Sequence, residues 1–177
     1  MLPFDHYAAH DDTHMMEWVD GVVTRLPPLS PRQSHVRDRL LAQFAAHAEM
    51  NGWGLVVPAP FTIRMPEEMR RGREPDLLFV PYAFIEAMHE RYVDSHGVGL
   101  VVEITDTRNR YLDCFEKFHD YERAGIPEYW VADVDLRVVR VFVLIGKHYV
   151  RAKPDPQGHL HSQALKGFIL APETLWR

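Results

Sequence analysis

The chain has 177 residues, of which 46% are hydrophobic, and a formal net charge of −5 at pH 7. This length fits one domain spanning residues 1–177, its one cysteine excludes an internal disulfide, and no segment has the ~20 apolar residues of a membrane span. The polar N-terminus does not resemble a secretory signal, so we expect a cytoplasmic protein. The acidic balance argues against a nonspecific nucleic-acid coat protein but is compatible with a nuclease.

Residues 1–14 are expected to form a loosely ordered terminal segment. His6, His10 and His14 recur every four residues and would share one face of a helix, as a zinc site would need. The neighbouring Asp11 and Asp12 are poor helix-interior residues. We therefore favour a solvated terminal segment over a metal site.

Residues 16–26 are predicted to form a β-hairpin that turns at Asp20-Gly21. A long amphipathic helix follows, with Ser30 as its N-cap and Pro31 as its first residue. Asn51-Gly52 ends this helix. Its apolar residues recur at four-residue spacing, and they are Val36, Leu40, Phe44 and Ala48.

The rest of the chain alternates short β-branched segments with helical ones. Helices are predicted over residues 82–92 and 109–123, and the second ends at Ala124-Gly125. We expect the closing segment to pack its apolar residues on the domain, namely Phe168, Ile169, Leu170 and Trp176. Strands are predicted over residues 55–57, 61–64, 76–80, 98–104, 129–132 and 138–144, with 148–151 as a further candidate. This order predicts an α/β domain with a mixed sheet.

Glu103 is an unexpected residue in the predicted strand 98–104, because the apolar run Val98–Val102 precedes it and Ile104 follows. A carboxylate near the core is costly unless it is paired or holds a metal.

Strand pairing would bring Glu103 close to a second carboxylate. If strands 76–80 and 98–104 are antiparallel neighbours, Asp76 and Glu103 lie at the same edge of the sheet. A helical crossover to the next strand would place Asp133 at that edge as well. Two carboxylates there form an oxygen-rich site for Mg²⁺ or Mn²⁺, and such a site suits phosphodiester cleavage, commonly with a lysine nearby.

The segments REPDLLFV, VVEITD and DCFEKFHDYERAGIPEYW together resemble the Uma family of putative restriction endonucleases, within the PD-(D/E)XK nuclease superfamily. The resemblance covers most of the chain, from Glu17–Gly21 to the closing LKGFILAP, and is densest over Asp113–Asp133. It implies a restriction-endonuclease-like mixed β-sheet core flanked by helices. It also implies a Mg²⁺- or Mn²⁺-dependent endonuclease that acts on DNA.

The resemblance assigns roles to individual residues. Pro75-Asp76 matches the PD of the superfamily and Glu103 matches its (D/E), which makes Asp76 and Glu103 the implied catalytic metal ligands. Thr105 stands where the motif lysine is expected, and Lys117 is the candidate catalytic replacement within the Uma-like pattern. Lys117 lies roughly 12 Å into its helix, so it reaches the site only if the helix leans over the sheet edge.

Several of these residues have structural alternatives. Lys117 could form a surface ion pair with Asp113, four residues earlier. We favour a turn role for Asp133 and a packing role for Tyr121, and Glu17 is a further candidate carboxylate.

An arginine-rich segment precedes Asp76, and within it Arg71 and Arg73 are the candidate nucleic-acid-binding residues. Glutamates are interleaved with these arginines, so an ordinary solvated loop is an equal alternative. Arg73 could also simply pair with Asp76. The arginines are Arg64, Arg70, Arg71 and Arg73, and the glutamates are Glu67, Glu68 and Glu74.

Two other functions compete with the nuclease. The first is a catalytically inactive nuclease-like binding or assembly module, which Thr105 and the acidic net charge favour. The second, weaker one is a metal sensor built on the N-terminal histidines. We also expect a homodimer by analogy, because cleavage of both strands of a duplex suits two-fold symmetry.

Overall fold

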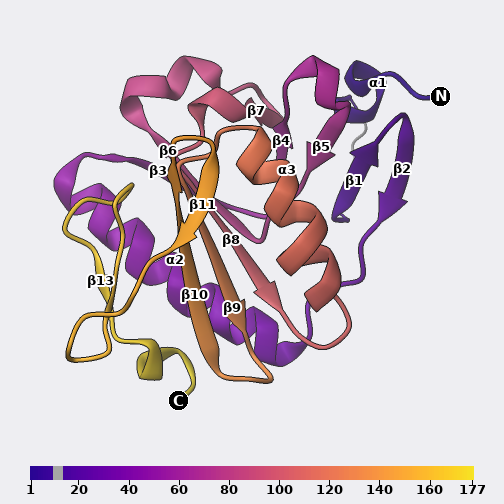
Figure 1. Cartoon of the computed structure of the whole chain (residues 1–177). Helices are drawn as coiled ribbons and strands as arrows, with labels where there is room; N and C mark the ends of the chain where they lie inside the picture. The colour runs from indigo at the N-terminus through magenta and orange to yellow at the C-terminus, as the bar shows by residue number, and fades with distance from the viewer. Residues whose placement is uncertain (10–13) are drawn as a thin grey trace.

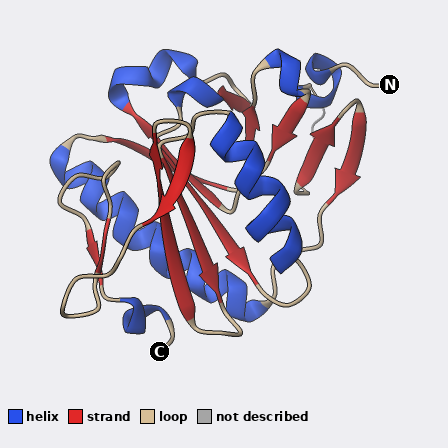
Figure 2. Cartoon of the chain, viewed as in Figure 1, coloured by secondary structure: helices blue, strands red, loops and turns tan. Residues whose placement is uncertain are grey.

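A six-stranded mixed β-sheet with helices on both faces forms the centre of the computed structural model, which describes residues 1–9 and 14–177 (Figure 1). Its strand order is β11-β10-β9-β8-β6-β3. These strands are β3 (Gly54–Pro58), β6 (Leu77–Pro81), β8 (Leu100–Thr105), β9 (Glu128–Asp133), β10 (Val138–Ile145) and β11 (His148–Arg151). Helix α2 (Pro31–Asn51) covers one face, and the π-helical turn η4 (Leu112–Lys117) with α3 (Phe118–Arg123) covers the other (Figure 2). The predicted α/β fold class is confirmed.

A smaller second sheet has the order β2-β1-β5-β4-β7. Its strands are β1 (Met16–Val19), β2 (Val22–Arg25), β4 (Thr62–Arg64), β5 (Arg71–Arg73) and β7 (Tyr92–Asp94). The predicted hairpin is confirmed as β1 and β2. The single helix predicted over residues 82–92 is wrong, because the 3₁₀ helix η2 (Tyr82–Ala87) is followed there by β7. Neither β5 nor β7 is predicted from the sequence, since three residues are too few for an apolar alternation.

The remaining elements are short. They are α1 (Phe4–Ala8), η1 (Glu67–Met69), η3 (Ser95–Gly97), β12 (Leu160–His161), β13 (Ile169–Leu170) and η5 (Pro172–Leu175). Phe168 and Leu170 are buried and Trp176 packs against the same core, as predicted. Ile169 differs from the prediction, because its side chain is 52% exposed.

The ends and the buried face of α2 follow the sequence closely. The Ser30 hydroxyl accepts a hydrogen bond from the backbone N–H of Gln33, and the Gln33 side chain accepts one from the Ser30 N–H, which completes a capping box. Gly52 ends the helix in the left-handed conformation, with φ 62°. The four apolar residues at four-residue spacing are buried, as predicted: Val36, Leu40, Phe44 and Ala48.

Strand β8 contributes to two separate cores, because successive side chains point to opposite faces of a strand. Leu100, Val102 and Ile104 pack with α2 on one face. Val101 packs on the other face, with Tyr121 of α3. Glu103 shares the face of Val101 by this alternation, and it therefore points toward η4 and α3.

The pairing of β8 with its two neighbours confirms the predicted topology. β6 runs antiparallel to β8, with Leu77 opposite Val102. β9 runs parallel to β8, with Asp133 opposite Thr105. The end of β8 that carries Glu103 is therefore the end at which β6 begins.

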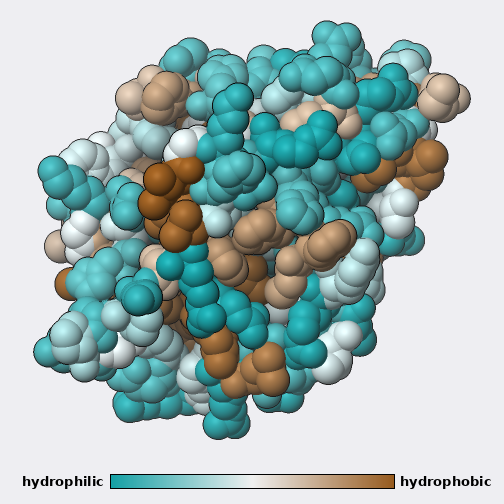
Figure 3. Space-filling view, viewed as in Figure 1, coloured by the Kyte–Doolittle hydropathy of each residue, from teal (hydrophilic) through white to brown (hydrophobic). Residues whose placement is uncertain are grey.

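The N-terminal segment is more ordered than expected over the residues that the structure describes. Tyr7 of α1 is only 4% exposed, and the ring of Phe4 contacts Trp18 and Tyr92. His10, one of the three histidines of the less favoured metal site, lies outside the described residues. Within the described ranges no helix is long and apolar enough to cross a membrane. The face seen in Figure 3 carries several apolar patches separated by polar side chains.

Candidate active site

Asp76 and Glu103 lie beside each other at the start of β6 and the end of β8. Since Leu77 pairs with Val102 in antiparallel register, the next position along brings Asp76 opposite Glu103. Asp76 Oδ2 accepts a hydrogen bond of 2.6 Å from the backbone N–H of Ile104. Asp76 is 3% exposed and Glu103 is 2% exposed, so the two carboxylates that sequence reasoning singled out are both buried.

Lys117 joins these carboxylates from the helix that crosses the same face of the sheet. Its Nζ lies 3.0 Å from Glu103 Oε1, 2.9 Å from Glu17 Oε1 and 3.5 Å from Asp113 Oδ1. The helix therefore bridges the gap that the sequence left open. The alternative of a surface ion pair with Asp113 is wrong, because both side chains are buried within one cluster.

Two further residues complete this cluster. Tyr121, which we expected only to pack, also donates a hydrogen bond of 2.6 Å to Glu103 Oε1. Asp113, which the sequence suggests only as an ion-pair partner of Lys117, is buried in the cluster. Its backbone carbonyl accepts a hydrogen bond from the Tyr129 hydroxyl. The four-residue spacing of Asp113, Lys117 and Tyr121 was the signal that they share one helix face.

Arg73 connects the cluster to the second sheet. Its guanidinium donates to Glu17 Oε2 at 2.6 Å and to Asp120 Oδ2 at 2.7 Å, and its side chain is 5% exposed. Its ion-pair partners among the described residues are Glu17, Asp120 and, at 3.9 Å, Glu116, and Asp76 is not among them. Arg71 is 23% exposed and donates to Asp20 Oδ2 at 2.7 Å.

Burial and mutual repulsion govern the protonation of the carboxylates. Burial raises the pKa of Asp76 to about 7, although the hydrogen bond from the Ile104 amide opposes the rise. Burial and the neighbouring carboxylates of Asp113 and Asp76 also raise the pKa of Glu103, which the positive charge of Lys117 opposes. The pair therefore binds protons more tightly than free carboxylates do.

The surroundings of Lys117 favour its charged form, whereas those of Asp76 and Glu103 favour the neutral form. Burial alone would lower the pKa of its ammonium group, but the surrounding carboxylates outweigh burial and hold this pKa well above its ordinary value. Glu103, Glu17 and Asp113 are the closest of these carboxylates. Lys117 is therefore a fixed positive charge at neutral pH.

The cluster holds more negative than positive charge, and it has unsatisfied oxygens. Asp76 Oδ1, Glu17 Oε1 and Asp113 Oδ1 are buried and accept no hydrogen bond from the described residues. Two of them face the ammonium of Lys117, whereas Asp76 Oδ1 has no ion pair either. An unpartnered carboxylate oxygen beside a second carboxylate fits a hard divalent cation.

The site is not a ready-made cage of protein ligands. Among residues 1–9 and 14–177, no group of three or more His, Cys, Asp or Glu side chains is arranged to hold a metal ion. Mg²⁺ commonly binds through one or two carboxylates together with water and substrate oxygens, so Asp76 and Glu103 suffice for this mode of binding.

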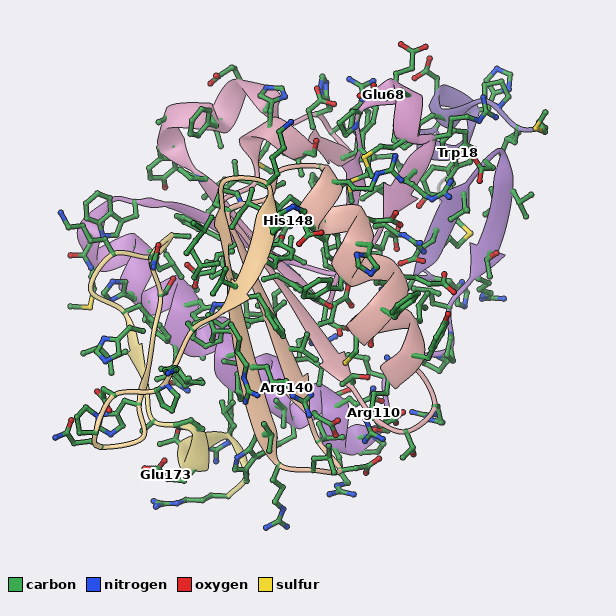
Figure 4. All side chains as sticks on the ribbon, viewed as in Figure 1. Trp18, Glu68, Arg110, Arg140, His148 and Glu173 are labelled. Carbon is green, nitrogen blue, oxygen red and sulfur yellow. The ribbon has the colours of Figure 1, made fainter. Side chains whose placement is uncertain are left out.

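Asp133, at the end of β9, has a separate structural role. Its carboxylate accepts hydrogen bonds from Arg110 at 2.7 and 3.1 Å and from the backbone N–H groups of Asp135 and Leu136. Figure 4 shows Arg110 at the end of the sheet where β8 and β9 finish. These contacts agree with the turn role that we favoured from the sequence.

A cavity of about 50 Å³ reaches the cluster, and the loop between β2 and α2 forms one of its walls. Leu26–Leu29 of this loop line the cavity together with Asp76, Glu103 and Lys117. The catalytic candidates therefore lie behind a proline-containing loop.

Comparison with known proteins places the chain in a family and identifies a similar fold. The model of the Uma2 family, described as "Putative restriction endonuclease", matches residues 3–173. This match confirms the resemblance inferred from the sequence motifs. No curated protein matches the chain.

A solved structure of a known protein has a similar fold. It is a crystal structure from Anabaena variabilis, described as "a putative nuclease belonging to DUF820", with a TM-score of 0.77. The match covers 99% of this chain and 98% of that chain at 11% sequence identity. At such low identity the likeness concerns the fold alone.

Proposed function

Because the chain belongs to the Uma2 family, we propose that it is a divalent-metal-dependent endonuclease that hydrolyses phosphodiester bonds in DNA. The observation that carries the proposal is the convergence of Asp76, Glu103 and Lys117 in one buried cluster. Lys117 Nζ lies 3.0 Å from Glu103 Oε1, and the backbone contact of Asp76 with Ile104 links the two strands that bear the carboxylates.

Asp76 and Glu103 are the residues that would hold Mg²⁺ or Mn²⁺. When bound, such a metal supplies activation of water and neutralisation of charge that grows on the phosphate. The free Oδ1 of Asp76 supports this assignment. Glu103 Oε1 accepts hydrogen bonds from Lys117 and Tyr121, which hold its carboxylate in a fixed orientation.

Lys117 acts as a charged group and not as a general base. Its raised pKa keeps the ammonium protonated at neutral pH, so it has no free lone pair to accept a proton from water. A fixed ammonium beside the scissile phosphate would stabilise the negative charge of the transition state. Glu17 and Asp113 hold Lys117 in place through their own ion pairs with its ammonium.

Cleavage of single-stranded circular DNA and of supercoiled plasmid with Mg²⁺ or Mn²⁺ tests the proposal. We expect cleavage by the wild-type protein and none by Glu103→Gln, which keeps the shape of the side chain and removes its charge. Asp135→Asn is a matched control, because Asp135 is a carboxylate outside the cluster. Equal cleavage by wild type and Glu103→Gln would contradict the metal site. Absence of cleavage and of Mn²⁺ binding in the wild type would favour the inactive binding module.

A further inference from the structure

A groove larger than the catalytic cavity lies on the other side of the β2–α2 loop. It encloses about 850 Å³. Leu26–Leu29 line both this groove and the catalytic cavity, so the two spaces share one wall. The opposite sides of the groove come from β2, the second turn of α2 and the loop after β3, through Arg25, Arg37 and Pro60.

The groove carries positive charge next to an acidic cluster. Arg25 and Arg37 line it, and no Asp or Glu is among its described lining residues. Arg25 is exposed and forms no ion pair with any residue in the described ranges. Among the described residues, Arg37 forms an ion pair with the exposed Asp38 alone, at 2.8 Å. Burial dominates the pKa of Asp76, and Arg37 is among the positive charges that lower it, so the charge of Arg37 acts at the site.

The arginines of the other arginine-rich surface already have carboxylate partners. A second groove contains Arg64, Arg70 and Arg71. Arg64 forms a bidentate pair with Asp94 at 2.6 and 3.0 Å, and both Arg70 and Arg71 lie near Asp20. An arginine that already has a carboxylate partner gains less from a phosphate. Arg37 also has a carboxylate partner, Asp38, but Arg25 has none among the described residues, and their groove shares the wall Leu26–Leu29 with the catalytic cavity. The groove of Arg25 and Arg37 is therefore the better placed phosphate-binding surface.

We propose that this groove binds a single strand of nucleic acid, with its phosphates on Arg25 and Arg37 and its bases or sugars on the apolar wall. This inference rests on the proposed nuclease function and names the form of the substrate. The wall of Leu26–Leu29, with two consecutive prolines, supplies apolar surface without charge. Phosphate contacts by arginine fix the register of a strand without reading its sequence.

The size of the groove and the burial of the site both favour a single strand. A groove of about 850 Å³ lies in the size range of ligand pockets, which is room for a few nucleotides. Asp76, Glu103 and Lys117 are each at most 3% exposed. A flexible strand can bend a phosphate toward such a recessed site, whereas a duplex is stiff over many base pairs.

Binding measured by fluorescence anisotropy tests this inference independently of cleavage. The parent protein carries Asp76→Asn and is kept in EDTA. The probes are fluorescein-labelled 12-nucleotide DNA strands of three unrelated sequences, and the duplexes that they form with their complements. The double variant Arg25→Gln/Arg37→Gln is compared with Arg123→Gln/Arg151→Gln. This control removes the same charge from two exposed arginines that form no ion pair with the described residues.

We expect the parent to bind single strands at least about tenfold more tightly than duplexes at 0.1 M salt. The groove variant should lose about tenfold in single-strand affinity. The slope of its log K against log salt concentration should be shallower by about 1.4, because two phosphate contacts are lost. The control variant should match the parent.

Each failure has a distinct meaning. Equal losses in the groove variant and the control would overturn the groove as the binding surface. Duplex binding as tight as single-strand binding would overturn the form of the substrate. If the parent binds neither probe, this inference is contradicted, and the cleavage assay with wild type and Glu103→Gln decides the nuclease proposal by itself. Circular dichroism melts confirm that each variant is folded.

Discussion

Replacing Asp76 with asparagine should stabilise the metal-free protein at alkaline pH, although Asp76 is proposed to be essential for activity. Its pKa rises from 3.8 to about 7 on folding, chiefly through burial. Each pKa unit corresponds to about 1.4 kcal/mol, so ionised Asp76 costs the folded state about 4 kcal/mol at pH 8. The asparagine side chain would carry no charge, and its oxygen can still accept the Ile104 amide hydrogen bond.

The sign of the effect follows from proton linkage. A raised folded-state pKa means that the contribution of Asp76 to stability is fully present below pH 3.8 and is lost as the pH rises to about 7. Asparagine does not titrate. The gain of Asp76→Asn over wild type should therefore be about 2.5 kcal/mol larger at pH 8 than at pH 5. This difference is independent of how well the amide packs.

Urea unfolding in EDTA at the two pH values measures this difference. Asp133→Asn is the matched control, because Arg110 and two backbone N–H groups lower the pKa of Asp133 despite its burial. That variant should lose stability at pH 8. A stability change for Asp76→Asn that is the same at pH 5 and pH 8 would refute the reasoning, because Asp76 would then be ionised without cost.

Three further predictions concern the cluster and the assembly. Lys117→Met should lower the free energy of unfolding by about 3–5 kcal/mol, because it leaves Glu103 buried without a cation and Glu17 with Arg73 alone; a loss below about 1 kcal/mol in urea unfolding would contradict this. The affinity of the wild type for Mn²⁺, measured by calorimetry, should rise by at least about tenfold per pH unit from pH 5 to 7, since Asp76 must lose its proton and burial raises the pKa of the second ligand, Glu103, as well; a flat profile would remove Asp76 from the ligands. The expected homodimer should give twice the 20.6 kDa chain mass in light scattering, and a concentration-independent monomer mass would exclude it.

The sequence predicts the carboxylate pair well because strand pairing is a local rule. Two consecutive apolar segments become neighbouring antiparallel strands, and this places Asp76 beside Glu103. The ends of α2 are equally predictable, since Ser30, Pro31 and Gly52 each act through their own backbone geometry. These features need no knowledge of distant packing.

The surroundings of the pair are not predictable in this way. The inward direction of Arg73 depends on a three-residue strand, β5, and one of the two partners of this strand, β1, lies far away in the chain. Glu17 enters the cluster from β1, and its low pKa, maintained by Lys117 and Arg73 against the cost of burial, depends on that assembly. Asp113 looks like an ordinary surface residue until the helix is placed on the sheet.

The π-helical turn that ends at Lys117 absorbs one residue within the helix that crosses the sheet. A wide turn of this kind corresponds to one inserted residue in an α-helix. Deleting one residue between Asp113 and Lys117 would let the turn rewind at about 100° per residue, and the segments on either side would keep nearly the same orientation about the helix axis. Asp113 and Lys117 would then be three residues apart, a spacing that still places both side chains on one helix face. The convergence of these two charges therefore tolerates a change of one residue in the length of this turn.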